Sequence, residues 1–166
     1  MLLLAAQSPG IAPDWELKPQ VEKIGPEVAR LKPLFDQLQP ERWTAAGAPE
    51  AYVKQWKDCL EQIGYVQNAA ARLAAQPSKL TLAVETLVRL ETLLDLSSSV
   101  SRAVRKYQNP AVADLLDSEI IAAGASRNWL RQHVTDLASV REKELESAEK
   151  EAQHCREIIL KQGGRK

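Results

Sequence analysis

Apolar residues recur every three or four positions along nearly the whole chain, and this spacing constrains the fold more than any other feature of the sequence. Such a repeat covers one face of an α-helix, whereas a half-buried strand requires strict alternation. No stretch alternates for long enough to predict a strand. The 166 residues are 45% hydrophobic, which is enough to bury the core of one domain. The sequence therefore predicts an all-α protein, an antiparallel bundle of about four helices.

The first apolar stripe shares its segment with regularly spaced prolines. The stripe consists of Leu17, Val21, Ile24, Val28, Leu31, Phe35 and Leu38. The prolines recur every seven residues, at Pro19, Pro26, Pro33 and Pro40. An interior proline removes a helix hydrogen bond at a cost of about 3 kcal/mol, but these four fall on the side away from the stripe. We expect a helical segment that breaks at Pro26 and bends at Pro33, with an extended polyproline-like arm as the alternative.

Proline and serine bound the next two helices. Pro49 suits the first position of a second helix, which ends before Pro77. Ser78 is then the expected N-cap of a third helix, which reaches to about residue 107. Residues 97–99 are serines in the middle of that helix, and we favour an exposed serine patch there over a close contact with a neighbouring helix.

The last helix is expected to be much longer than the others. Asn109 and Pro110 mark its start, as N-cap and first helical residue. Its apolar pattern runs to about residue 161, and Gly124 alone interrupts it. A continuous helix of about 52 residues is about 78 Å long, so it would overhang the bundle. A hinge at Gly124 that folds the chain back is the alternative.

The overhanging part, residues 141–166, combines interleaved charges with a narrow apolar seam. It carries seven basic and six acidic residues. The seam keeps heptad spacing at Leu145, Ala148, Ala152, Cys155 and Ile159. This spacing suits a partner helix, as in a coiled coil, and a solvated helical tail is the alternative. We therefore divide the chain into an N-terminal stretch (1–13), a helical bundle (14–140) and a charged extension (141–166).

Residues 1–6 are apolar and resemble the end of a signal peptide. They lack its charged n-region and the run of about seven to fifteen apolar residues that an h-region needs. Two interpretations stay open: a signal-peptide remnant, which favours a secreted or periplasmic location over a cytoplasmic one, and an apolar N-terminus without a targeting role. No uncharged apolar stretch reaches about 18 residues, so we expect no membrane span.

The two cysteines, Cys59 and Cys155, fall at different heights of an up-down bundle. With a continuous last helix, about 35 residues of helix, or about 50 Å, separate them. A disulfide needs Cα atoms within about 7 Å, so an intrachain bond is excluded unless the chain folds back at Gly124. Without that fold, we interpret Cys59 as a small core residue and Cys155 as a candidate for a bond to another chain.

No pattern of residues predicts catalysis or a cofactor. Glu151 and His154 match the Glu-x-x-His of di-iron bundles, but the chain has no second copy of that motif. His133 lies near Trp129 on the edge of the apolar face, and we interpret it as a packed or surface histidine rather than a ligand. The balance of 22 Lys+Arg and 22 Asp+Glu argues against a nucleic-acid-binding surface. We expect no cofactor and no nucleic-acid partner.

These observations favour a non-catalytic interaction or scaffold protein, which binds a protein partner or associates with itself. The expected contacts are the apolar seam and Trp43, which lies in a segment (42–49) that we interpret as a loop. One alternative is a bundle that carries a metal or a small apolar ligand near His133. Another is an enzyme whose site the motifs do not reveal.

Overall fold

A computed structural model describes residues 11–163 of the chain, so the apolar run at residues 1–6 lies outside the described residues. The described part is all-α and contains no strand. Its helices are α1 (Asp14–Glu22), α2 (Ile24–Ala29), α3 (Leu31–Asp36), α4 (Pro40–Ala45), α5 (Ala51–Ala75), α6 (Leu80–Tyr107) and α7 (Pro110–Gly163). The predicted all-α bundle with a long last helix is thus confirmed. No helix among these residues is long and apolar enough to cross a membrane.

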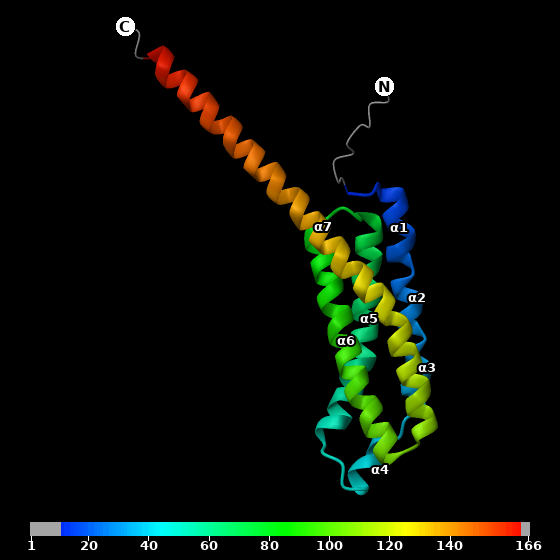
Figure 1. The fold of residues 1–166 in the computed structure, drawn as a ribbon. Helices are drawn as coiled ribbons and strands as arrows, with labels where there is room; N and C mark the ends of the chain where they lie inside the picture. The colour runs from blue at the N-terminus through cyan, green and yellow to red at the C-terminus, as the bar shows by residue number, and fades with distance from the viewer. Residues whose placement is uncertain (1–10, 164–166) are drawn as a thin grey trace, which may run out of the picture.

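The bundle is antiparallel, and its members are the series α1–α3 and the helices α5, α6 and α7 (Figure 1). The series α1–α3 runs down, α5 returns, α6 runs down again and α7 rises past the top of the bundle. α6 packs along both α5 and α7, and α1–α3 close the bundle against the same two helices. The short α4 lies at the lower end, where it contacts α5 and α6.

The prolines explain why the first member is divided into short helices. Pro26 and Pro33 have no N–H, so the carbonyl groups four residues earlier, at Glu22 and Ala29, lose their helix partner. α1 ends at the first of these residues and α2 at the second. The residues between the helices, Lys23 and Arg30, keep right-handed helical angles (φ −70°, ψ −29° and φ −66°, ψ −21°).

Because the winding continues through these breaks, the apolar stripe stays on one face. All seven of its predicted members are buried: Leu17, Val21, Ile24, Val28, Leu31, Phe35 and Leu38. The polyproline-like alternative is therefore wrong.

The segment 42–49 corrects one prediction. Residues 42–45 are helical, as the end of α4, and only residues 46–49 form the expected loop. The loop includes Gly47, whose φ of +88° favours glycine. Trp43 is fully buried, and its indole Nε1–H donates a hydrogen bond to Oε1 of Gln108 (2.9 Å). Trp43 seals the lower end of the bundle and is not available as a partner contact.

Two serines also differ from expectation. Ser78 does not cap α6, because its hydroxyl donates to the carboxylate of Asp14 and Lys79 occupies the cap position without a side-chain bond. Ser97 is fully buried, with its Oγ 4.0 Å from Sγ of Cys59 on α5. Small side chains let α5 and α6 approach here. Ser98 and Ser99 are half-buried, and the hydroxyl of Ser99 donates to Oε1 of Gln55 on α5 (2.8 Å), so the exposed serine patch that we favoured is wrong.

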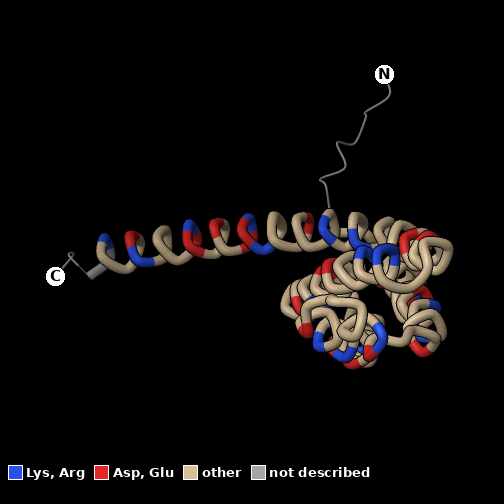
Figure 2. The backbone as a smooth tube through the Cα atoms, turned by 90° about the horizontal axis from the view of Figure 1, so that it is seen from below, with Lys and Arg blue, Asp and Glu red and all other residues tan. Residues whose placement is uncertain are grey.

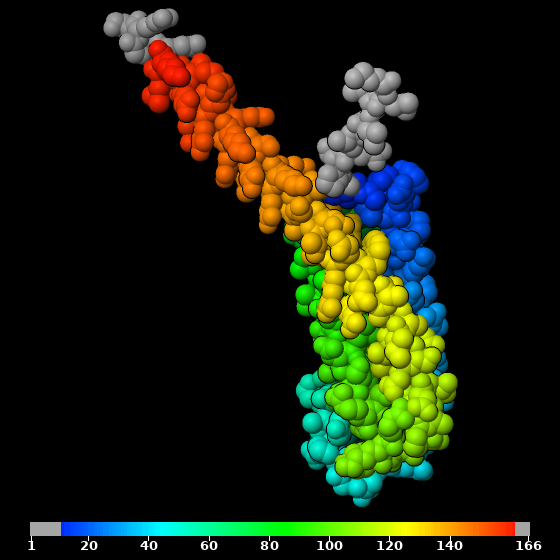
Figure 3. Space-filling view, in the orientation of Figure 1, coloured from blue at the N-terminus to red at the C-terminus, as the bar shows by residue number. Residues whose placement is uncertain are grey.

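α7 is one uninterrupted helix of 54 residues, about 81 Å long. The side chain of Asn109 caps its start, as predicted, because Oδ1 accepts the N–H of Ala111 (2.9 Å). The helix continues through Gly124, so the hinge alternative is wrong. Leu137 is its last fully buried residue, and every described side chain from residue 141 to 161 is exposed. Figure 3 shows this part of α7 standing clear of the bundle.

Candidate interaction surface

Residues 141–161 of α7, which we call the overhang, carry the predicted seam. The helix holds Leu145, Ala148, Ala152, Cys155 and Ile159 at steps of three and four residues, so all five lie along one side. Leu145 is 61% exposed and Ile159 67%. Among residues 11–163 the structure therefore shows an apolar line without a cover, and whether a partner helix covers it remains a prediction.

Charged residues occupy much of the rest of the overhang. Lys/Arg and Asp/Glu alternate along it (Figure 2). Near its base, Nη1 of Arg141 donates to Oε2 of Glu144 at 2.6 Å, between two side chains that are about half exposed. Such a pair contributes little to stability in water. The charges hydrate most of the overhang outside the seam, where Ile158 and Leu160 are the other exposed large apolar residues.

The two cysteines are free thiols in very different surroundings. Cys59 is fully buried beside Ser97, and burial raises the pKa of its thiol to about 12. Cys155 is exposed on the overhang. Because α7 does not fold back, the structure keeps the two thiols apart, as the sequence predicted. Only Cys155 is placed to react with another molecule.

His133 is a packed residue, which confirms its interpretation from the sequence. It is 4% exposed, its Nε2 lies 2.8 Å from the carbonyl oxygen of Pro77, and its ring stacks on Trp129 at 5.1 Å between centroids. A small cavity of about 170 Å³ lies beside it and is also lined by Ile11 and Leu17. The residues that the structure describes include no group of three or more His, Cys, Asp or Glu that could hold a metal. Nothing at this position favours the carrier hypothesis.

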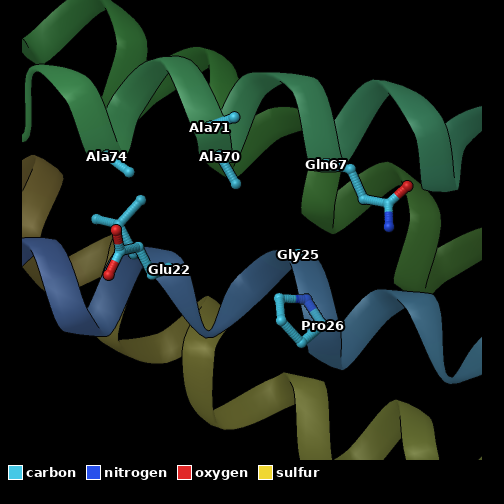
Figure 4. A pocket seen from close by; sticks show the side chains of 8 residues that line it. Glu22, Gly25, Pro26, Gln67, Ala70, Ala71 and Ala74 are labelled. Atoms are coloured by element: carbon cyan, nitrogen blue, oxygen red, sulfur yellow. The ribbon is translucent and has the colours of Figure 1, made fainter.

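A larger groove of about 330 Å³ lies between α1–α2 and α5. Figure 4 shows Ala70 and Ala74 of α5 facing the stretch that contains Gly25 and Pro26. The groove exists because the proline break meets small side chains. Glu22 is the one ionisable residue in its lining, so its chemistry indicates no particular ligand.

Sequence reasoning missed a polar contact that joins the ends of α6 and α7. Nη2 of Arg105 donates to Oδ1 of Asp114 (2.6 Å) and to Oδ2 of Asp117 (2.8 Å), and these bonds raise the pKa of the guanidinium. The hydroxyl of Ser101 also donates to Asp117 (2.5 Å). The signal was present in the sequence, because an antiparallel helix pair with a short connection brings the last turn of one helix against the first turn of the next.

This arrangement is structural, since all of these polar groups bond to each other. The overhang is therefore the candidate interaction surface, because its exposed apolar seam has no role in the packing of the bundle. Comparisons with family models, with curated proteins and with solved structures give no match to this chain.

Proposed function

We propose that this protein is a non-catalytic interaction or scaffold protein that presents the overhang to a partner helix. One observation carries the proposal: α7 continues for more than twenty residues past the bundle and keeps an apolar seam that no other described part of the chain covers. An exposed apolar line on a highly charged helix is typical of a surface that binds another protein.

Physical chemistry supports a covered seam. The overhang continues the buried part of α7, so the bundle supplies its helix nucleus. The main source of helix stability in proteins, however, is packing of an apolar face, which the overhang does not have in this chain's described residues. Burying a leucine or isoleucine side chain contributes about 1.5–3 kcal/mol. Leu145 and Ile159 therefore supply a driving force for association, and a partner would stabilise the helical form of the overhang. A location outside the cytoplasm stays part of the proposal and rests only on residues 1–6.

Removal of residues 141–166 tests the proposal. We expect the shortened chain to keep its cooperative thermal unfolding, because the bundle core lies before residue 141. We also expect it to lose self-association, measured by light scattering, and to lose capture of an identified partner from native cells. The full chain with Leu160→Lys is the matched control, because Leu160 is 75% exposed but lies beside the seam rather than in it. Unchanged mass together with unchanged capture after truncation would contradict the proposal.

A further inference from the structure

We propose that the partner of the overhang is a second copy of this chain, paired antiparallel so that Ile159 of each copy packs on Ala148 of the other. This inference rests on the proposed function, because it names the helix that covers the seam. In heptad terms Leu145, Ala152 and Ile159 occupy a positions, and Ala148 and Cys155 occupy d positions.

The sizes of the seam residues favour the antiparallel arrangement. The seam has a large residue at each end and three small residues between them. A parallel pair in register sets Ala148 on Ala148 and Ala152 on Ala152, which leaves poorly filled layers next to each other. In the antiparallel pair, Ala148 lies opposite Ile159 and Ala152 opposite Cys155. Ile159 then fills the space beside Ala148, and no layer pairs alanine with alanine, as knobs-into-holes packing favours. Leu145 lies opposite position 162, beyond the seam.

The charges beside the seam favour the same arrangement. In a parallel pair, Glu144 of each copy lies near Glu149 of the other, and these two contacts are repulsive. They oppose the attraction between Glu151 of each copy and Arg156 of the other. In the antiparallel pair, Glu149 lies near Arg156 of the other copy, twice. No like-charge contact is made by the flanking residues that the structure describes.

The charges also select one antiparallel register. In the neighbouring register, each helix is shifted by one heptad along the other, so that the two bundles come closer together. Glu149 then faces Glu149 of the other copy and Glu151 faces Glu151, at the centre of the contact. The shift also moves Ile159 opposite Arg141. Like charges that face each other are unfavourable, so the register with Ile159 on Ala148 is the one that both size and charge support.

The shape of the molecule allows this pairing. The overhang leaves the bundle obliquely (Figure 1), and every described side chain from residue 141 to 161 is exposed. In the proposed register the two copies of Val140 are about 27 residues apart along the helix axis, or about 40 Å. The bundles therefore lie at opposite ends of the pair and do not collide.

The register predicts how the thiols meet. Cys155 faces Ala152 of the other copy, and the two Cys155 residues lie in neighbouring layers, about 4.5 Å apart along the axis. A parallel pair would instead set Cys155 directly on Cys155. The positions at which thiols cross-link therefore distinguish the two arrangements.

The test mixes two versions of the chain, which carry tags of different length. One is the natural chain, with Cys155 on the seam, and the other is the double variant Ala152→Cys with Cys155→Ala. Diamide takes two protons and two electrons from a pair of facing thiols, and the buried Cys59 stays out of the reaction. We expect the mixed disulfide to form at least tenfold faster than either disulfide between like chains. Replacing the double variant by Leu160→Cys with Cys155→Ala is the control, and it should abolish the fast reaction.

Fast cross-linking between like chains would overturn the antiparallel arrangement. A single monomeric species in sedimentation equilibrium at all concentrations would overturn the second copy as partner. If the full chain still captures an identified partner that the truncated chain loses, the proposed function survives this failure.

A pair of variants at neighbouring positions completes the test. We expect Ile159→Lys to give a monomer, because it places a charge in the seam on both ends of the contact. Leu160→Lys, one residue away, should leave the dimer intact. Far-ultraviolet circular dichroism checks that both chains keep the helical bundle. Equal association of the two variants would overturn the assignment of the seam.

Discussion

The two parts of α7 belong to one helix, but the apolar face of the first is buried and that of the second is exposed to solvent. Residues 110–140 carry six charged side chains, and their apolar face is buried, with Leu116, Leu130 and Leu137 fully covered. Residues 141–161 carry eleven charged side chains, and their apolar face is exposed. Both parts show apolar spacing of three and four residues. The comparison teaches that such spacing identifies the side of a helix that favours contact, whereas the number of charges indicates whether the same chain supplies that contact.

The largest expected effect is a difference in the free energy of unfolding between two variants, each with one leucine of α7 replaced by alanine. Leu130→Ala removes a fully buried side chain and leaves a cavity, so we expect it to lower the free energy of unfolding by about 2–5 kcal/mol. Leu145→Ala, at an exposed position, should change bundle stability by less than about 0.5 kcal/mol.

Urea denaturation at low protein concentration measures both effects, because dilution keeps association out of the result. If Leu145→Ala also cost several kcal/mol in the dilute monomer, the overhang would be packed against its own bundle.

The second effect is a loss of stability at high pH that depends on Cys59 and not on Cys155. Burial raises the pKa of Cys59 to about 12 from an ordinary value of 9.0. The unfolded chain therefore loses this proton at a lower pH than the folded chain, and stability falls between about pH 9 and 12. From pH 8 to pH 10 the contribution of this one group falls by about 1.4 kcal/mol.

The measurement is urea denaturation of the natural chain and of Cys59→Ala at both pH values. The natural chain should lose about 1.4 kcal/mol more than the variant. Cys155→Ala is the control, since its position is exposed, and it should lose as much as the natural chain. Equal losses for the natural chain and Cys59→Ala would show that this thiol titrates normally.

The bundle could be predicted from the sequence because helix periodicity is a local property. The stripe from Leu17 to Leu38 was identified in full despite its prolines, since Pro19, Pro26 and Pro33 are exposed on the side away from it. The prediction was wrong for Pro40, which follows the stripe and is buried as the first residue of α4. The start of α7 was identified because Asn109 caps the residues that directly follow it. In both cases the residues that determine the structure are close together in the chain.

Contacts between distant segments could not be predicted in this way. The indole of Trp43 bonds to Gln108, 65 residues away, and nothing near Trp43 in the sequence indicates that partner. Ser97 is buried because Cys59 on another helix leaves room for it. The seam was found from its heptad spacing, but the identity of its cover depends on a second molecule, which periodicity alone does not describe.

The smallest expected effect is a gain in stability from replacing Gly124, which lies in the bundled part of α7. Gly124 is helical, and a Cβ built there would meet only Nη2 of Arg127, at an ordinary contact distance of 3.9 Å. Gly124→Ala should therefore raise the free energy of unfolding by about 0.5–1 kcal/mol, because alanine loses less backbone freedom on forming a helix. Gly64→Ala in α5, where nothing lies within 4 Å, should give a similar gain by urea denaturation and is the control. A gain at Gly64 with a loss at Gly124 would mean that α7 needs to bend there, and a bent α7 would no longer hold the overhang in line with the bundled part.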